Sequence, residues 1–397
     1  MALKRSIESN VCDAKVLYQL GCKYRYYEEV LQSYKIALHY FQLARDHGNI
    51  DAISCIGEMY EKGLGVNKDL DTALKLFKEA SDKRNVRATR KLGECLRARN
   101  ESPVDLEQAA ELFAIAAERG DIEALWRLGL CYESGDGVSK DPKRALTLYM
   151  DAAKAGNVTG HNCVGQCFQR GIGTSKDTTQ AKQYFQVAAD TNSPFAQFSL
   201  GSLYTSENTQ NEELLKKAVE LFKKAAKANS GLASILAASH LGKRYFYGLG
   251  VPQDFHKARK YLERAAAQGN SCAQLDLGTM YLEDSLVQDY TKGVFFIKCS
   301  ADQGNKDAQF TLGALYESGE GVSVDPEKAF EYYSLAASQN FLDAAFNVAV
   351  SFHNGEGVPQ NLKKAQDYYQ LCADDGDEEA KTRLRRLRSI SEEQNAT

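Results

Sequence analysis

The chain has 397 residues, a formal net charge of −4, and 26% charged against 43% hydrophobic residues. This balance argues against a general attraction to nucleic acid or to anionic membranes. No window approaches about eighteen uncharged apolar residues, and the first fifteen residues lack the apolar core of a signal peptide. We therefore expect a cytoplasmic protein with no nucleic-acid partner and no membrane insertion.

A Leu-Gly pair, or a close variant of it, recurs along the chain, and seven of the nine intervals between its occurrences are 36 residues. Self-similarity at this period is typical of solenoids, in which each unit buries its apolar face against its neighbours. We place about ten repeats in residues 16–379, between a leader (1–15) and a C-terminal cap and tail (380–397). The repeats start near residues 16, 52, 88, 124, 160, 196, 237, 273, 308 and 344.

The repeat at residues 124–159 shows the local pattern. Ala124, Leu128 and Tyr132 have the spacing of one helical face, and a double-glycine turn then breaks the helix. Asp141, directly before a proline, is typical of a helix N-cap, and a second apolar stripe follows. Each repeat is therefore predicted to be two antiparallel helices. The predicted caps of the second helices are Asp69, Asp105, Asp141, Asp177, Asp254, Asp289, Asp325 and Asn361.

The full pattern, Ala-x-x-x-Leu-Gly-x-x-Tyr-x-x-Gly-x-Gly-Val-x-x-Asp with Ala, Tyr, Ala-Ala and Gly in the second helix, resembles the SEL-one-like repeat. This family is a branch of the tetratricopeptide superfamily, and the resemblance covers more than nine-tenths of the chain. It implies an all-α fold, a right-handed α/α superhelical solenoid with a C-terminal capping helix. It also implies an adaptor or scaffold that binds one or more proteins or peptide segments on its concave face.

Three repeats depart from the pattern. The repeat from Ala88 loses the double glycine and has Leu96 in the tyrosine column. The repeat from Ala196 is five residues longer, with four of the extra residues near 230–237, and the repeat from Ala273 loses one residue at 284–286. These changes are either tolerated variation of exposed turns or loops that serve particular partners.

The sequence offers no catalytic constellation. Six histidines sit at unrelated repeat positions, and no metalloprotease motif or nucleophile elbow occurs. Ten cysteines do not recur in matched pairs, so we expect free thiols. Some cysteine-rich relatives, for which hydrolase activity has been proposed, need two cysteines eight residues apart, and no such pair exists here. We expect no enzyme activity, no metal and no cofactor, with a regulatory subunit of one enzyme as the alternative to an adaptor.

The first candidate binding site follows a Leu-Gly pair, where residues of the first helix are expected to face the concave side. Lys243, Arg244, Phe246 and Tyr247 join cations and aromatic rings just before a glycine turn. Such a set can anchor a partner, because a few residues carry most of the binding energy of an interface. We predict that these four residues form part of a partner site.

A basic cluster between residues 83 and 99 is the second candidate. Arg90 and Arg97 are seven residues apart and therefore share a helical face, on which an acidic segment could dock. The alternative is that Glu58 and Glu61, one repeat earlier, pair with these cations across the repeat boundary.

The C-terminal segment is predicted to close the solenoid. Leu384 and Leu387 are expected to cover the last repeat while neighbouring arginines face solvent. Ser389 and Ser391 each follow an arginine by three residues, a pattern that basophilic kinases phosphorylate.

Overall fold

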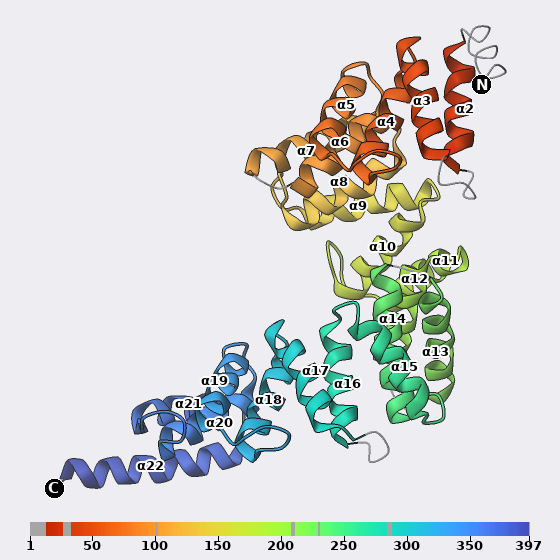
Figure 1. The fold of residues 1–397 in the computed structure, drawn as a ribbon. Coiled ribbons are helices and arrows are strands. Elements are labelled where there is room, and N and C mark those ends of the chain that lie inside the picture. The colour runs from red at the N-terminus through yellow and green to blue at the C-terminus, as the bar shows by residue number, and fades with distance from the viewer. Residues whose placement is uncertain are drawn as a thin grey trace. The chain divides into compact units, whose positions relative to one another are not determined.

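The computed structural model describes residues 13–26, 33–99, 102–207, 211–228, 231–283 and 288–396, and for Tyr26, Glu207 and residues 389–396 it describes the backbone alone. Within these ranges the chain forms twenty-one α-helices and no strand (Figure 1). The helices are α2 (Ala14–Tyr26), α3 (Ser33–Asp46), α4 (Ile50–Lys62), α5 (Leu70–Asp82), α6 (Val86–Arg99), α7 (Pro103–Glu118), α8 (Ile122–Ser134), α9 (Pro142–Lys154), α10 (Val158–Arg170), α11 (Thr178–Asp190), α12 (Pro194–Glu207), α13 (Glu212–Ala226), α14 (Leu232–Tyr247), α15 (Phe255–Ala266), α16 (Ser271–Glu283), α17 (Tyr290–Asp302), α18 (Lys306–Ser318), α19 (Pro326–Ala337), α20 (Leu342–Asn354), α21 (Leu362–Asp374) and α22 (Glu378–Ala396). The all-α fold class is confirmed.

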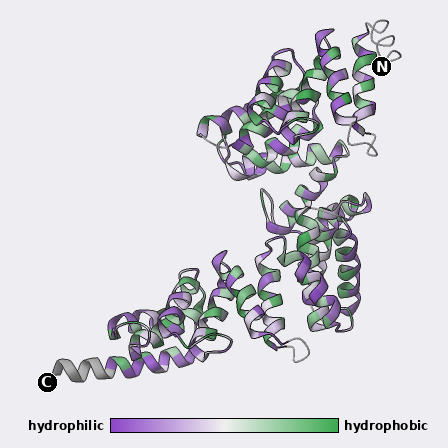
Figure 2. Cartoon of the chain, viewed as in Figure 1, coloured by the Kyte–Doolittle hydropathy of each residue, from purple (hydrophilic) through white to green (hydrophobic). Residues whose placement is uncertain are grey.

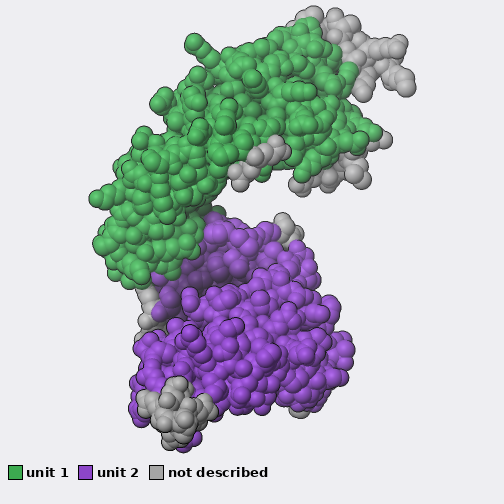
Figure 3. All heavy atoms as spheres, turned by 90° about the vertical axis from the view of Figure 1, so that its left-hand side faces the viewer, with its two compact units in different colours: residues 1–191 green, residues 192–397 purple. Residues whose placement is uncertain are grey.

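The helices pair as the repeat predicts. Even-numbered helices from α2 to α20 are the first helices of repeats, and each packs on the odd-numbered second helix that follows it. The chain divides into two compact units, residues 1–191 with α2–α11 and residues 192–397 with α12–α22 (Figure 3). Hydrophobic and hydrophilic residues alternate along the helices of both units (Figure 2), as helices with one packed and one solvated face require. Among the described helices, none combines the length and apolarity that crossing a bilayer needs.

The Leu-Gly pair has a packing cause. In α8, a Cβ added to Gly129 would lie 2.5 Å from the ring of Tyr149 in α9, and one added to Gly57 would lie 2.7 Å from the ring of Phe77. Both aromatic side chains are fully buried. The first helix therefore needs a residue without a side chain where the large ring of the second helix packs.

The caps follow the predicted pattern with one exception. Asp141 accepts hydrogen bonds from the backbone N–H groups of the next helix, and Gly135 ends the helix before it in the left-handed conformation. Asp105 does not cap α7, because Ser102 accepts the capping hydrogen bond and Pro103 begins the helix. Asp105 lies within the first turn instead and pairs with Arg99 at 2.6 Å.

Part of the insertion in the longer repeat extends a helix of the second unit. Helix α14 has 16 residues, whereas α16, α18 and α20 have 13. The three added residues are close to one helical turn of about 3.6 residues, so the helix faces keep nearly the same direction. The altered turn at 284–286 lies outside the described residues, as does most of the predicted leader.

The last helix packs on the final repeat as a cap. In α22, Leu384 and Leu387 are buried, and the guanidinium of Arg383 lies 5.3 Å from the centre of the Phe346 ring. The side chains of Ser389 and Ser391 lie outside the described residues, so their phosphorylation stays a prediction.

Candidate functional site

The first helices carry most of the charged residues that meet across repeat boundaries in the first unit. Glu58 of α4, whose side chain is 2% exposed, accepts a hydrogen bond from Arg25 of α2 at 2.5 Å and pairs with Arg87 of α6 at 2.6 Å. Burial by itself would raise the pKa of Glu58, but the hydrogen bond and charge of Arg25 and the charge of Arg87 hold this pKa below its ordinary value. One carboxylate therefore joins three consecutive repeats.

A second carboxylate continues these contacts. Glu94 of α6 accepts hydrogen bonds from Arg90 and, at 2.9 Å, from Lys91, and it pairs with Arg127 of α8 at 2.8 Å. Lys91 also reaches Glu61 of α4 at 3.4 Å. We call this set of pairs, together with those of Glu58, the ion-pair network.

The network corrects the expectation of an open basic patch. Arg90 has a side chain only 12% exposed, and it bonds to both Glu94 and Asp121. The alternative that the sequence left open, pairing with Glu58 and Glu61 of the preceding repeat, holds for Arg87 and Lys91. Arg87, Arg90 and Lys91 are therefore neutralised within the fold.

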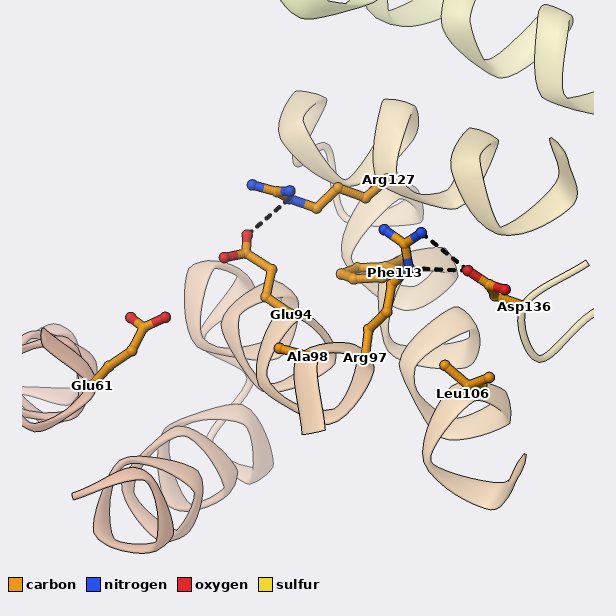
Figure 4. A pocket seen from close by; sticks show the side chains of 8 residues that line it. All are labelled: Glu61, Glu94, Arg97, Ala98, Leu106, Phe113, Arg127 and Asp136. Atoms are coloured by element: carbon orange, nitrogen blue, oxygen red, sulfur yellow. Dashed lines mark hydrogen bonds and ion pairs between the residues drawn. The ribbon is translucent and has the colours of Figure 1, made fainter. Parts of the chain in front are cut away.

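Arg97 differs from Arg90 in that its side chain lines a hollow in the surface. Its side chain is 33% exposed and donates two hydrogen bonds to Asp136, at 3.0 and 3.3 Å. The hollow measures about 530 Å³ and lies in the first unit (Figure 4). Its lining residues are Glu61, Glu94, Arg97, Ala98, Leu106, Phe113, Arg127 and Asp136. Figure 4 shows Arg127 turned toward Glu94 and Arg97 turned toward Asp136 around it, so its charges are already paired with one another.

In the second unit, the structure separates the four residues predicted on α14. Arg244 is 8% exposed, with its guanidinium 5.6 Å from the centre of the Phe222 ring and a hydrogen bond of 3.3 Å to the carbonyl of Leu249. Phe246 is 5% exposed and packs edge-on against Phe255. Both residues support the fold, which corrects the expectation that all four are available to a partner.

Lys243 and Tyr247 remain at the surface. They are four residues apart on α14, and the side chain of Tyr247 is 51% exposed. Each even-numbered helix has one side that the odd-numbered helices do not cover. We call these sides together the first-helix face. Lys243 and Tyr247 lie on it beside α16, which contacts α14.

The neighbouring helix α16 adds two carboxylates to this place. Asp276 is half-buried, and burial raises its pKa to about 6, against the opposing charge of Lys243. Glu283 is exposed and occupies the same repeat position as Tyr247, 36 residues later. Burial raises the pKa of Tyr247, and the charges of Asp276 and Glu283 raise it further. We call Lys243, Tyr247, Asp276 and Glu283 the α14–α16 cluster.

Sequence reasoning missed the two carboxylates, although a signal was present. The residues one place before Leu-Gly in the ten repeats are Gln19, Cys55, Lys91, Arg127, Cys163, Ser199, His240, Asp276, Thr311 and Asn347. Asp276 is the one carboxylate in this column. Comparing columns would therefore have identified it.

The remaining titratable groups offer little chemistry. Nine cysteines among the described residues are free thiols, and burial raises the pKa of Cys131 to about 11 and that of Cys163 to about 12. Burial lowers the pKa of His240 to about 4, which leaves it neutral. Within the described part of the chain, no three His, Cys, Asp or Glu side chains gather where they could hold a metal ion.

Comparison with known proteins gives one family and several similar structures. The Sel1 repeat model matches residues 14–49, 55–85, 86–121, 122–157, 164–193, 194–230, 235–270, 273–305, 306–341 and 342–377. The structure of c5321, a protective antigen of uropathogenic Escherichia coli strains with an SLR fold, is 25% identical, with a TM-score of 0.53 over 99% of this chain and 90% of that one. A Sel1 repeat protein from Oxalobacter formigenes is 25% identical, with a TM-score of 0.57 over 79% of this chain and 90% of that one.

A more distant structure shares the fold alone. Human IFIT1, solved as a dimer with PPP-AAAA, is 14% identical, with a TM-score of 0.52 over 96% of this chain and 95% of that one. Among curated proteins, no sequence matches this chain significantly.

Proposed function

Because this chain belongs to the Sel1 repeat family, whose solenoids are typical of protein-interaction scaffolds, we propose that it is a non-enzymatic adaptor that binds segments of partner proteins on its first-helix face. The α14–α16 cluster carries this proposal. There an aromatic side chain that is 51% exposed stands beside charged groups on two adjacent first helices. Aromatic anchors surrounded by polar groups are what protein interfaces use.

The hollow near Arg97 is a second place on the same kind of surface. Its charges are paired with one another, so a partner segment entering it must exchange these pairs for its own. Breaking these ion pairs costs free energy. The α14–α16 cluster is therefore favoured as the main anchor, because a partner can bind its charged groups without first breaking an ion pair between described residues.

The proposal is tested by purifying partners from the native cell with the full chain and two matched variants. Tyr247→Ala removes an exposed ring from a first helix, and Phe295→Ala removes a ring that is 59% exposed from the second helix α17. We expect Tyr247→Ala to lose a partner that both the wild type and Phe295→Ala retain.

Two results would contradict the proposal. One is capture of every partner by Tyr247→Ala as efficiently as by the wild type. The other is loss of the partner with Phe295→Ala alone. A single partner at a fixed ratio to the chain would favour a regulatory subunit of one enzyme over an adaptor for several proteins.

A further inference from the structure

Asp276 is a charged group that the fold leaves without a partner. Its side chain is half-buried on α16, yet among the residues that the structure describes none donates a hydrogen bond to its carboxylate or forms an ion pair with it. Partial withdrawal of a carboxylate from water, with no donor to replace the lost hydration, disfavours its charged form. Neighbouring repeats place the uncharged Thr311 and Asn347 in this column, so the repeat itself does not require a carboxylate there.

The residues around Asp276 fit a planar cation such as a guanidinium. The exposed ring of Tyr247 offers a face on which a planar cation can stack. Glu283 supplies a second carboxylate at the same repeat position as Tyr247 on the adjacent helix. Against these two negative charges stands the single positive charge of Lys243, so the α14–α16 cluster has a formal charge of −1.

We propose that the α14–α16 cluster binds an arginine side chain of a partner segment, with the guanidinium stacked on Tyr247 and hydrogen-bonded to Asp276 and Glu283. Arginine fits better than lysine, because its planar guanidinium presents several donors in fixed directions and stacks on aromatic rings. The inference rests on the proposed function, since it names the chemistry of a segment bound on the first-helix face. Lys243, exposed one turn before Tyr247, is then available to a carboxylate elsewhere in the same segment.

Position within the solenoid supports the assignment. The first unit also places acidic side chains on first helices, but there Glu58 pairs with Arg25 and Arg87 of the two neighbouring repeats. Glu94 pairs with Arg90 and Lys91 of its own helix and with Arg127 of the next repeat. Near Asp276, the one cation that the neighbouring first helix α14 places among the described residues is Lys243, and it lies beyond ion-pair distance from the carboxylate. An arginine from outside would give Asp276 the kind of partner that Arg25 gives Glu58.

The first experiment selects peptides from a random display library on the folded full chain, using the wild type, Asp276→Asn and Glu331→Gln. Glu331→Gln is the control, because it removes an exposed carboxylate from the second helix α19. We expect the wild type and Glu331→Gln to enrich peptides with a shared arginine, and Asp276→Asn to lose that enrichment. Circular dichroism of each variant establishes that it is folded.

The second experiment is a double-mutant cycle on the strongest selected peptide. Changing Asp276 to Asn, or the arginine of the peptide to Gln, is expected to weaken binding by about 10-fold to 100-fold, the range for a hydrogen bond to a charged group. Making both changes together is expected to weaken binding little more than either alone, because both remove the same contact.

The outcomes separate this inference from the proposed function. Selected peptides without a shared arginine, or arginine peptides that bind Asp276→Asn as tightly as the wild type, overturn the inference and leave an adaptor with another specificity. Additive effects in the cycle also overturn it. If no peptide binds any of the three proteins, the proposed function fails as well.

Discussion

Replacing Asp276 by Asn is predicted to stabilise the second unit in a pH-dependent way. Burial raises the pKa of this carboxyl from 3.8 to about 6, so the folded state holds its proton to a higher pH than the unfolded chain does. Between about pH 4 and pH 6 the folded wild type therefore binds more protons than the unfolded chain, and its stability falls as the pH rises through this interval. Asn does not titrate, so the variant escapes this loss.

The expected magnitude follows from the two pKa values. At about 1.36 kcal/mol per pKa unit, the difference between 3.8 and about 6 corresponds to at most about 3 kcal/mol. Asp276 is half-buried and retains some contact with water, so we expect about 1–2 kcal/mol. This gain is fully present above about pH 7 and absent below about pH 3.5.

Hydrogen exchange of the backbone amides in α14 and α16 measures this change locally. Wild type and variant are compared at the same pH, once near 3.5 and once near 7.5, so that the intrinsic exchange rate cancels. At pH 7.5 we expect the variant to exchange more slowly, by about tenfold for each 1.4 kcal/mol, and at pH 3.5 we expect equal rates. Equal differences at both pH values, or faster exchange of the variant at pH 7.5, would refute the reasoning.

Three further predictions concern the packing of the first unit and the thiols. Glu58→Ala is expected to destabilise the first unit by about 3–5 kcal/mol, since it removes the buried carboxylate that pairs with Arg25 and Arg87; Glu79→Ala breaks two solvent-exposed pairs, with Arg45 and Lys83, and is expected to change stability by about 0–1 kcal/mol for each pair; urea unfolding compares the two variants. Gly129→Ala is expected to lower the free energy of unfolding by about 1–3 kcal/mol, because the new methyl group would lie 2.5 Å from the ring of Tyr149. The urea midpoint should fall accordingly, and an unchanged midpoint would contradict this packing. Among the nine cysteines that the structure describes, Cys272 is exposed and is expected to react with a thiol reagent at pH 8 well before the buried thiols, which mass spectrometry of the modified peptides can follow.

Most of the fold could be predicted because the same short-range pattern of helix, cap and turn residues recurs in each repeat. The glycine beside Tyr149 and the capping Asp141 both follow from short-range geometry, and ten repetitions make the pattern unambiguous. The repeat position predicts Asp105 as the cap of α7, but Ser102 and Pro103 form a capping sequence of their own three and two residues earlier. Here a local signal competed with the repeat position and determined the cap.

The candidate site was predicted less well because it depends on which way each side chain points. Lys243 and Tyr247, four residues apart, share one face of α14, and that face is exposed. Arg244 is rotated from this face into a column that holds Met59 and Met280 in other repeats, so its burial could have been read from the repeat. Pairs such as the one joining Glu58 to Arg25 depend on side-chain conformations and on contacts between repeats, which no local pattern specifies.

The contrast between the two carboxylates argues for where a partner binds. Glu58 is buried more deeply than Asp276, yet its hydrogen bond and ion pairs hold its pKa below the ordinary value, because Arg25 and Arg87 offset the cost of burial. Asp276 has no such partner among the described residues, and its pKa moves in the opposite direction. A solenoid can supply cations from its own neighbouring repeats, as the first unit does. We therefore expect a cation supplied by a partner protein to stabilise the folded chain at Asp276, which has no ion pair among the described residues.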